Sequence, residues 1–363
     1  MAESVTIVLP CRNEETRIEA CLDSLLRFTG LEEVQWEIWV FDGASEDGTA
    51  RIVQDYTAKE PRVLYFLNEL RLQGLAVNQA STKEPGDFLL WLGAHAEYPE
   101  DYLARLLDTA EQTNADIVGG ILETRSGGTG YGAAVVQSLT THRFGVGDSG
   151  FRTGVKEGPT DTVPFALYRR ELFNKVGLFD ERLIRAQDYE FNRRVKAAGG
   201  TVWLNPEIQS VYYNQESFCE FLRKQICLEA PYNVYLWYLA PHAFALRHGV
   251  TGCFVLGVIG GLILSPFFDW IRWIFSGVML LYGLLAVGAG LQQAVRYREP
   301  RHAVCLPFAF FLFHFFHGLG VLCGLLRLVT GTAPVQKTSE PWPGAGRKRA
   351  WPIPAMEAQG GDG

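Results

Sequence analysis

The chain has 363 residues, 48% of them hydrophobic, which is enough for one large or two ordinary domains with a substantial core. Its 33 basic and 40 acidic side chains give a net charge of −7, and a nucleic-acid-binding surface normally shows as a basic stripe or an extreme pI, so no nucleic acid polymer is expected as a partner. The seven cysteines are odd in number and contain no Cys-x-x-Cys pair, which indicates reduced side chains that mostly pack in apolar surroundings.

The first ten residues have no basic region and only a short apolar run before Pro10, so they are not expected to act as a signal peptide. Beyond them the composition changes along the chain. Charges occur throughout up to about residue 246, whereas residues 250–326 are apolar with few interruptions. We therefore predict a cytoplasmic domain over residues 1–235, followed by a membrane region over residues 250–328.

Short apolar runs alternate with helical spacing in the N-terminal half. Strands are predicted at residues 5–9, 36–41, 63–67, 87–92 and 117–122, and helices at residues 14–26, 50–56 and 74–80. Successive βα units predict the α/β class, with a Rossmann-like and mostly parallel sheet covered by helices on both faces. Ligands of such sheets bind at the carboxyl ends of the strands, where the loops 10–15 and 42–49 and the loop after Leu92 fall.

Three apolar segments follow at residues 250–268, 270–291 and 303–326, each near the ~20 residues that a membrane-spanning helix needs. The connection before the third segment is basic, which predicts a cytoplasmic position for it by the positive-inside rule. These features predict a multi-pass protein of the inner (plasma) membrane with its large domain in the cytoplasm.

The third apolar segment leaves two arrangements open. A full crossing would export the basic residues of the C-terminal tail, so residues 303–326 either cross or form a re-entrant hairpin helped by Pro307. Residues 236–249 are predicted to form an interfacial linker helix. Residues 329–363 are rich in Pro and Gly without periodicity, which predicts a disordered tail.

Polar residues follow the first two strands at the predicted ligand edge. The loop after Pro10 offers free backbone N–H groups and a helix dipole to a phosphate or ribose, although an ordinary strand-to-helix turn explains it too. Asp42 ends the second strand and can accept hydrogen bonds from a base or ribose, while Gly43 allows close approach of the chain.

A later acidic residue opens a long polar helix. Asp188 lies in the sequence Gln187-Asp-Tyr-Glu190 at the predicted start of this helix. Acidic residues at a helix start often complement the helix dipole, so this position has a structural explanation. Its alternative role is that of a general base.

Three stretches in this order, residues 5–15, 40–49 and 165–195, resemble the family 2 glycosyltransferases, and closely the branch that includes succinoglycan (exopolysaccharide) biosynthesis enzymes. The resemblance runs over about residues 5–235. It implies a GT-A type fold and an inverting hexosyltransferase-type enzyme that uses a nucleotide sugar, with a UDP-sugar expected, and a polyprenyl-linked or glycan acceptor. In such an enzyme Asp188 is the catalytic base, which takes the proton of the acceptor hydroxyl.

The resemblance also implies binding residues in this sequence. The expected contacts to the donor nucleotide come from Pro10, Arg12, Glu14, Asp42, Gly43, Gly74 and Asn78. For Gly74 and Asn78 a plain amphipathic helix is an equally good explanation. The glycine-rich loop 145–154 is expected to cover an anion or the acceptor, and the expected residues for acceptor or phosphate are Arg152, Asp161, Gln187 and Gln225.

The chain departs from the family pattern at the expected metal site. Related enzymes carry Asp-Ala-His-Ala or a DxD motif where this chain reads Leu92-Gly-Ala-His95, so Gly93 replaces the first Asp. His95 remains as the one conventional ligand of the triplet, and Mn²⁺ accepts nitrogen ligands more readily than Mg²⁺. Three hypotheses stay open. Mn²⁺ or Mg²⁺ is bound with help from Glu97 or substrate phosphates, basic residues neutralise the diphosphate instead, or His95 only hydrogen-bonds a loop.

Two other functions compete with this interpretation. One is a polyprenyl-phosphate sugar synthase, whose acceptor is the lipid phosphate itself. The other is a catalytically silent relative that binds a nucleotide sugar within an assembly complex, an idea that Gly93 motivates. A need for Asp188 in sugar transfer would argue against both.

Overall fold

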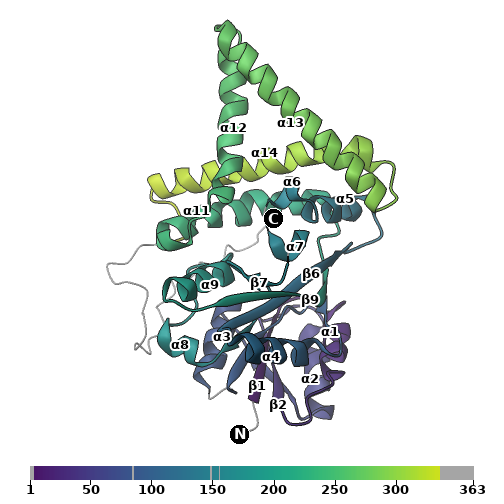
Figure 1. Cartoon of the computed structure of the whole chain (residues 1–363). Coiled ribbons are helices and arrows are strands. Elements are labelled where there is room, and N and C mark those ends of the chain that lie inside the picture. The colour runs from purple at the N-terminus through teal and green to yellow at the C-terminus, as the bar shows by residue number, and fades with distance from the viewer. Residues whose placement is uncertain (1–3, 84–85, 148, 155, 336–363) are drawn as a thin grey trace.

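The computed structural model describes residues 4–83, 86–147, 149–154 and 156–335, which form an α/β domain capped by three long helices (Figure 1). The described strands make one nine-stranded sheet in the order β3-β2-β1-β4-β8-β6-β9-β5, with β7 paired to β9. Their bounds are β1 Ser4–Cys11, β2 Gln35–Asp42, β3 Val63–Leu67, β4 Phe88–Trp91, β5 Ala96–Glu97, β6 Ile117–Arg125, β7 Gly158–Pro159, β8 Leu167–Arg169 and β9 Val202–Tyr213.

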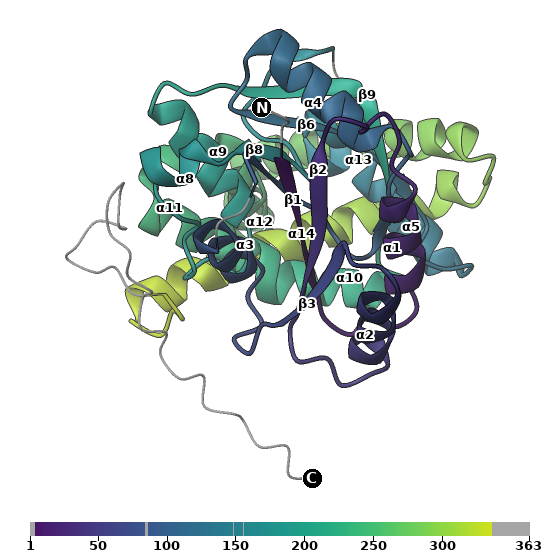
Figure 2. The ribbon, with the colours of Figure 1, turned by 90° about the horizontal axis from the view of Figure 1, so that it is seen from below.

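Helices cover both faces of the sheet, and Figure 2 shows α1 and α2 on one side of strands β1 to β3 and α3 on the other. The helices of the domain are α1 Ile18–Leu26, α2 Thr49–Lys59, α3 Gln73–Thr82, α4 Tyr102–Thr113, α5 Tyr131–Thr140, α6 Arg143–Val146, α7 Gly150–Thr153, α8 Glu171–Lys175, α9 Gln187–Ala197 and α10 Phe218–Lys224. A π-helical turn, η1 Gln225–Glu229, continues α10 into α11 Ala230–Leu239, and the 3-10 turn η2 Pro241–Ala243 follows.

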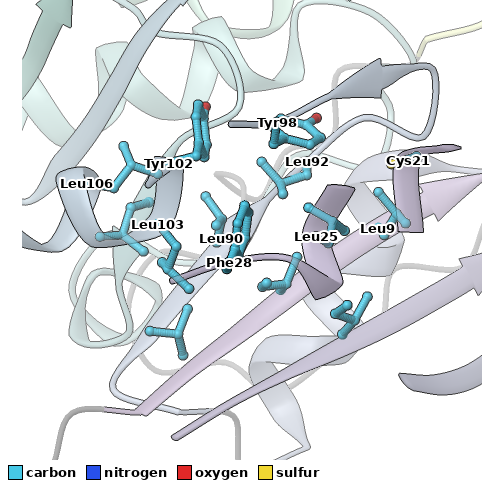
Figure 3. Close-up of a cluster of buried hydrophobic side chains, with 14 of the residues drawn as sticks. Leu9, Cys21, Leu25, Phe28, Leu90, Leu92, Tyr98, Tyr102, Leu103 and Leu106 are labelled. Atoms are coloured by element: carbon cyan, nitrogen blue, oxygen red, sulfur yellow. The ribbon is translucent and has the colours of Figure 1, made fainter. Parts of the chain in front are cut away.

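Alternate residues of each central strand point to opposite faces, so the sheet has two apolar cores. On β1, Ile7 and Leu9 pack with α1 and α4, while Val8 packs with α3 and α9. Figure 3 shows part of the first core, in which the ring of Phe28 stacks beside that of Tyr102 with centroids 6.5 Å apart. The predicted α/β fold with helices on both faces is confirmed.

The sheet is mostly parallel, as predicted, but it also contains short antiparallel strands, so it is mixed. Strands β3, β2, β1 and β4 are parallel, as are β6 and β9, but β8 runs antiparallel to both β4 and β6. Strands β5 and β7 also pair with β9 in antiparallel fashion. β8 has three residues, Leu167–Arg169, which is too short a run to show alternation in the sequence.

The C-terminal helices are α12 Leu246–Leu264, α13 Asp269–Arg296 and α14 His302–Val329. Among the described residues α13 and α14 are long and apolar enough to cross a membrane, by length and composition, while the apolar part of α12, Gly249–Leu264, is shorter. The three predicted spans are thus two helices of that length and one shorter helix. In Figure 1 α12 and α13 meet at an apex, and α14 runs across their base above the α/β domain.

Two expectations for this region are settled. Of the two arrangements left open for residues 303–326 the re-entrant hairpin is not seen, because α14 is one unbroken helix that continues through Pro307, although a proline inside a helix removes one backbone hydrogen bond. Residues 236–249 are not a separate linker helix, because they comprise the end of α11, the turn η2 and the start of α12. The predicted tail at 329–363 lies outside the described residues from residue 336 onward.

Glycines on α14 bring it into close contact with its neighbours. A Cβ atom at Gly320 would lie 2.8 Å from Cβ of Ala230, and one at Gly324 would lie 2.9 Å from Cα of Pro231. On another side a Cβ atom at Gly318 would overlap the backbone carbonyl of Thr251 on α12. The helix is therefore packed against both the α/β domain and α12.

We predict that Gly318→Ala destabilises the protein by about 1–3 kcal/mol, because the backbone of α12 must move away from the added methyl group. The matched control is Gly288→Ala on α13, where no atom lies within 4 Å of the added Cβ and alanine favours the helix. Thermal unfolding in detergent micelles measures both. Equal midpoints for the two variants would contradict close packing of α12 on α14.

Candidate active site

The loops after β1 and β2 are tied together by hydrogen bonds. The Asn13 amide donates to Oγ of Ser45 at 2.9 Å, and Oδ1 of Asn13 accepts from the Glu46 amide at 2.9 Å. The Glu14 amide donates to Oγ1 of Thr49 at 2.8 Å. The two loops thus form one edge of the sheet, and Asn13 adopts a left-handed conformation with φ of 54° to make these contacts.

Asp42 is buried at this edge. Its carboxylate accepts from the Ser45 amide at 3.2 Å and from the hydroxyl of Tyr65 at 3.1 Å. Burial, together with the charge of Asp42, raises the pKa of Tyr65 to about 12, so this hydroxyl stays a donor. A Cβ atom at Gly43 would lie 3.2 Å from Cβ of Arg12, which leaves little room for a side chain there.

Two exposed guanidinium groups border the same edge. Those of Arg12 and Arg71 each lie 3.8 Å from Oε1 of Glu46. At more than 40% side-chain exposure such pairs contribute little to stability, so both cations can turn to an anionic ligand. Pro10 is buried opposite Phe41 at the end of β1. It therefore supports the loop from inside and is not exposed to a ligand.

The segment after β4 places His95 beside the first loop. Nδ1 of His95 lies 3.4 Å from Oε1 of Glu14, and the edge of the imidazole meets the ring of Tyr212, with centroids 5.1 Å apart. Gly93 is walled in, because a Cβ atom there would lie 2.7 Å from Cε1 of Phe165. The aromatic ring thus occupies the space into which a carboxylate at position 93 would extend.

These residues do not fit a metal site built from protein side chains alone. Among the described residues no three His, Cys, Asp or Glu side chains gather in a way that could hold a metal ion. His95 and Glu14 pair with each other, and Glu97 accepts a hydrogen bond from the hydroxyl of Tyr213 at 2.9 Å. A cation here would depend on ligands from a bound substrate.

Asp188 is the second residue of α9 and is half-buried. Burial raises the pKa of its carboxyl group, and the charge of Glu229 adds to this, while a hydrogen bond from the Tyr189 amide and the charge of Arg152 act in the opposite direction. Ala186, just before the helix, adopts a left-handed conformation with φ of 58°. Such conformations in residues other than glycine often occur at functional sites.

Helix α9 is held rigidly in the domain. Glu190 is buried and receives Nε and Nη2 of Arg194 at 2.9 and 2.6 Å, and Nε2 of His242 lies 3.3 Å from it. The ring of Phe191 stacks on that of Phe179 with centroids 4.3 Å apart. Asp188 therefore projects from a fixed helix.

Helix α3 supports the chain that leads to Asp188. The carboxamide of Asn78 donates to the backbone oxygen of Phe179 at 3.0 Å and to Oε1 of Glu181 at 2.8 Å, and its oxygen accepts from the Phe179 amide at 2.8 Å. Gly74 faces Phe179 and Gln187, and a Cβ atom there would be in ordinary contact with both, so the space does not require a glycine. This buried arrangement favours a positioning role for Asn78 over direct contact with a nucleotide.

A cavity of about 610 Å³ lies between part of the α/β domain and the C-terminal helices. Arg152, Tyr212 and Gln225 line it, and the guanidinium of Arg152 lies 5.4 Å from the ring centroid of Tyr212. Asp161 does not line the cavity and lies 3.5 Å from the hydroxyl of Tyr189. The predicted acceptor residues are thus divided between the cavity and the surroundings of α9.

Residues 6–177 match the sequence profile of Glycosyl transferase family 2. The chain carries a family 2 glycosyltransferase domain. This confirms the family to which the three sequence stretches pointed, although Asp188 lies beyond the matched residues.

Two relatives extend the comparison. A succinoglycan biosynthesis protein of Rhizobium meliloti is 34% identical over 216 residues, which are 58% of this chain and 63% of that protein, so the chain spans less than two thirds of its length. A dolichyl N-acetyl-α-D-glucosaminyl phosphate 3-β-D-2,3-diacetamido-2,3-dideoxy-β-D-glucuronosyltransferase of Methanococcus voltae is 27% identical over 333 residues, 89% of this chain and 97% of that protein.

A solved structure shares the fold. A mannosyltransferase of Pyrobaculum calidifontis, in complex with GDP-mannose and Mn²⁺, superposes with a TM-score of 0.53 at 17% identity, covering 90% of this chain and 86% of the other. At that identity the likeness shows the fold alone. It confirms the predicted GT-A type architecture.

Several residues at the edge of the glycosyltransferase domain were not found from the sequence. Tyr65 holds Asp42, Tyr212 meets His95, and Phe165 fills the space beside Gly93. Each belongs to a strand or segment whose neighbours are set by pairing across the sheet. The polar residues within the apolar helices, such as His314 and His317, were a visible signal for the cavity that they line.

We predict that Gly93→Asp destabilises the domain by about 1–3 kcal/mol, because the new side chain collides with the ring of Phe165. The control is Gly130→Asp, at the residue preceding α5, where a Cβ atom meets nothing within 4 Å and Asp is a favourable N-cap. Thermal unfolding measures both, and adding Phe165→Ala to Gly93→Asp should recover part of the loss. An unchanged midpoint for Gly93→Asp would contradict the wall formed by Phe165.

The raised pKa of Asp188 predicts how Asp188→Asn depends on pH. The folded state binds this proton more tightly than the unfolded state, so the ionised carboxylate lowers stability at neutral pH. Asp188→Asn should therefore unfold at a higher temperature than wild type at pH 7.5. The difference should shrink as pH falls through the folded pKa and vanish below the ordinary Asp value of about 3.9. A difference that grows on acidification would show that the pKa is lowered instead.

Proposed function

We propose that this glycosyltransferase transfers a sugar from a nucleotide-sugar donor to a lipid-linked or glycan acceptor at a membrane surface, with inversion at the anomeric carbon. The observation that carries the proposal is the setting of Asp188. Its carboxyl group responds to the charges of Arg152 and Glu229, and both of these residues line the cavity beneath the C-terminal helices. A base in this setting is within electrostatic reach of a cavity that can hold an acceptor.

The proposed reaction is a single displacement. The acceptor oxygen forms a bond to the anomeric carbon while the bond from that carbon to the diphosphate breaks, and the nucleoside diphosphate leaves with the electron pair. Asp188 takes the proton of the acceptor hydroxyl. Its raised pKa makes it a stronger base than an exposed Asp.

We assign the donor to the edge formed by the loops after β1 and β2. Asp42 is held in place by Ser45 and Tyr65 and can accept from a uracil imide or a ribose hydroxyl. Arg12 and Arg71 can turn from Glu46 to the diphosphate and neutralise part of its charge. A UDP-sugar is the proposed donor, and no step is routed through a metal ion, although the Pyrobaculum relative was solved with Mn²⁺.

We further propose that α12 and α13 enter the membrane as a hairpin, with the catalytic domain on the cytoplasmic face of the plasma membrane. Leu281, Leu284 and Trp273 of α13 are among many exposed apolar residues there. At the apex Arg272 pairs with Asp269 at 2.6 Å beside Trp270, as is common where a chain reaches a membrane surface. Helix α14 packs on α11 and η1 of the catalytic domain. We therefore propose that α14 lies along the membrane surface and does not cross the membrane.

The cations of the cavity also support a second candidate, a polyprenyl-phosphate sugar synthase. Arg143, Arg152 and Lys224 line the cavity and could hold a phosphate that itself attacks the sugar. Such an acceptor is already ionised and needs little help from a base. The two functions therefore differ in their need for Asp188.

We predict that Asp188→Asn lowers sugar transfer by about 10²–10⁴-fold, because the isosteric amide cannot take the acceptor proton. Membranes carrying the protein are incubated with a panel of labelled nucleotide sugars and lipid extract, and the lipid-bound label is counted. The matched control is Asp108→Asn, an exposed carboxylate on α4, which should transfer at the wild-type rate.

The other outcomes of this assay identify the alternatives. Transfer that persists in Asp188→Asn would favour the synthase. No transfer from any donor, with nucleotide binding retained, would favour a catalytically silent relative. Adding EDTA, Mn²⁺ or Mg²⁺ to the same assay tests whether transfer needs a metal ion, and therefore whether His95 can belong to a metal site.

A further inference from the structure

The cavity between the α/β domain and the C-terminal helices has two chemically different walls. On the domain side it is lined by the turn that contains α6 and α7, by the end of β9 and by η1. On the other side it is lined by residues of α12, α13 and α14. Figure 1 shows α14 crossing directly above α6 and α11, so these walls come from segments far apart in the sequence.

The domain side is positively charged. Arg143, Arg152 and Lys224 line the cavity, and Glu229 is the only carboxylate among its described lining residues. Nζ of Lys224 lies 3.6 Å from Oε1 of Glu229, which also lies 3.3 Å from Nε of Arg185. Two cations share this one carboxylate, so charge remains for an anionic ligand. Guanidinium and ammonium groups together are typical of phosphate recognition.

The helix side combines polar and aromatic groups. Oγ1 of Thr251 lies 2.8 Å from Nδ1 of His317, and the hydroxyl of Tyr282 lies 2.8 Å from Nδ1 of His314. All four residues line the cavity. Polar side chains on otherwise apolar helices of a membrane protein usually face a cavity or pathway used by a polar group.

Aromatic side chains complete this wall. Phe254 of α12 and Phe313 of α14 line the same cavity beside Val250. Their rings offer apolar surface in the same cavity as the cations of the opposite wall. A ligand that fits both walls has an anionic head and a long apolar chain.

The cavity also communicates with the candidate base. The charges of Arg152 and Glu229 both act on Asp188, and Tyr212, another lining residue, meets the ring of His95. A ligand head in the cavity would therefore lie beside residues that interact with Asp188 on one hand and with His95 on the other.

We propose that this cavity binds the phosphate-bearing end of a polyprenyl lipid, the carrier of the acceptor. Arg143, Arg152 and Lys224 bind its phosphate, and Phe254 and Phe313 pack against the first isoprene units. This inference rests on the proposed function, because it names the acceptor class of the same enzyme. The phosphate is held by the protein while the acceptor group faces Asp188.

Binding of labelled undecaprenyl phosphate to the full chain in phosphatidylcholine nanodiscs tests the proposal. Arg143→Gln and Lys224→Gln should each weaken binding about tenfold or more, the loss of one charge-assisted contact. The matched control is Arg223→Gln, the exposed neighbour of Lys224 outside the cavity, which should bind as wild type does. Undecaprenol, which lacks the phosphate, should bind at least about tenfold more weakly.

Three results would overturn the proposal. They are equal affinities for undecaprenyl phosphate and undecaprenol, displacement of the label by millimolar inorganic phosphate alone, and displacement by phosphatidylglycerol added to the nanodiscs. The second would indicate a free-phosphate site, and the third a general anionic-lipid surface. Equal losses in Lys224→Gln and Arg223→Gln would also contradict it.

The same preparations distinguish this proposal from the proposed function. Nucleotide-sugar binding and sugar transfer are measured beside lipid binding. If sugar is transferred but the lipid does not bind in the cavity, the carrier site is wrong and the glycosyltransferase activity stands. If the lipid binds as expected but no donor supports transfer, the proposed function is wrong.

Discussion

The parallel register of β1 against β2 sets Cys11 opposite Asp42 and so ends both strands at one edge. The loops that follow can then bond to each other, through Asn13 to Ser45 and through Glu14 to Thr49. Without that register Asp42 and Arg12 would not face the same space. His95 joins this edge because β4 pairs in parallel on the other side of β1.

The base that we propose depends on different forces. Asp188 stands at the start of a helix whose next residues are buried, with Glu190 paired to Arg194 and Phe191 stacked on Phe179. A buried charge without its partner strongly destabilises a protein. Positions of α9 that would separate Glu190 from Arg194 are therefore disfavoured. The N-terminus of α9 favours an ionised carboxylate, while its partial burial disfavours one.

The C-terminal helices form the second wall of the cavity beside this glycosyltransferase domain. The small residues Gly318, Gly320 and Gly324 allow α14 to approach α12, η1 and α11 closely. As a result the π-helical turn that begins at Gln225 lies beneath α14, and the cavity between them is lined by both. π-helical turns are rare and are frequent at functional sites. The C-terminal helices thus form part of a cavity beside the domain, whatever their relation to a membrane.

The sequence by itself determined the α/β class, the strands at 5–9, 36–41 and 63–67, the family and the apolar helices, because periodicity and short motifs are local properties. It also singled out Asp42, His95 and Asp188, whose roles stay predictions. Tertiary structure decided which groups meet. It put Phe165 against Gly93, Asn78 against Phe179, and α14 across the domain instead of folded as a hairpin. These contacts join residues far apart in the chain, and pairing across the sheet and packing between helices set them, which no local pattern encodes.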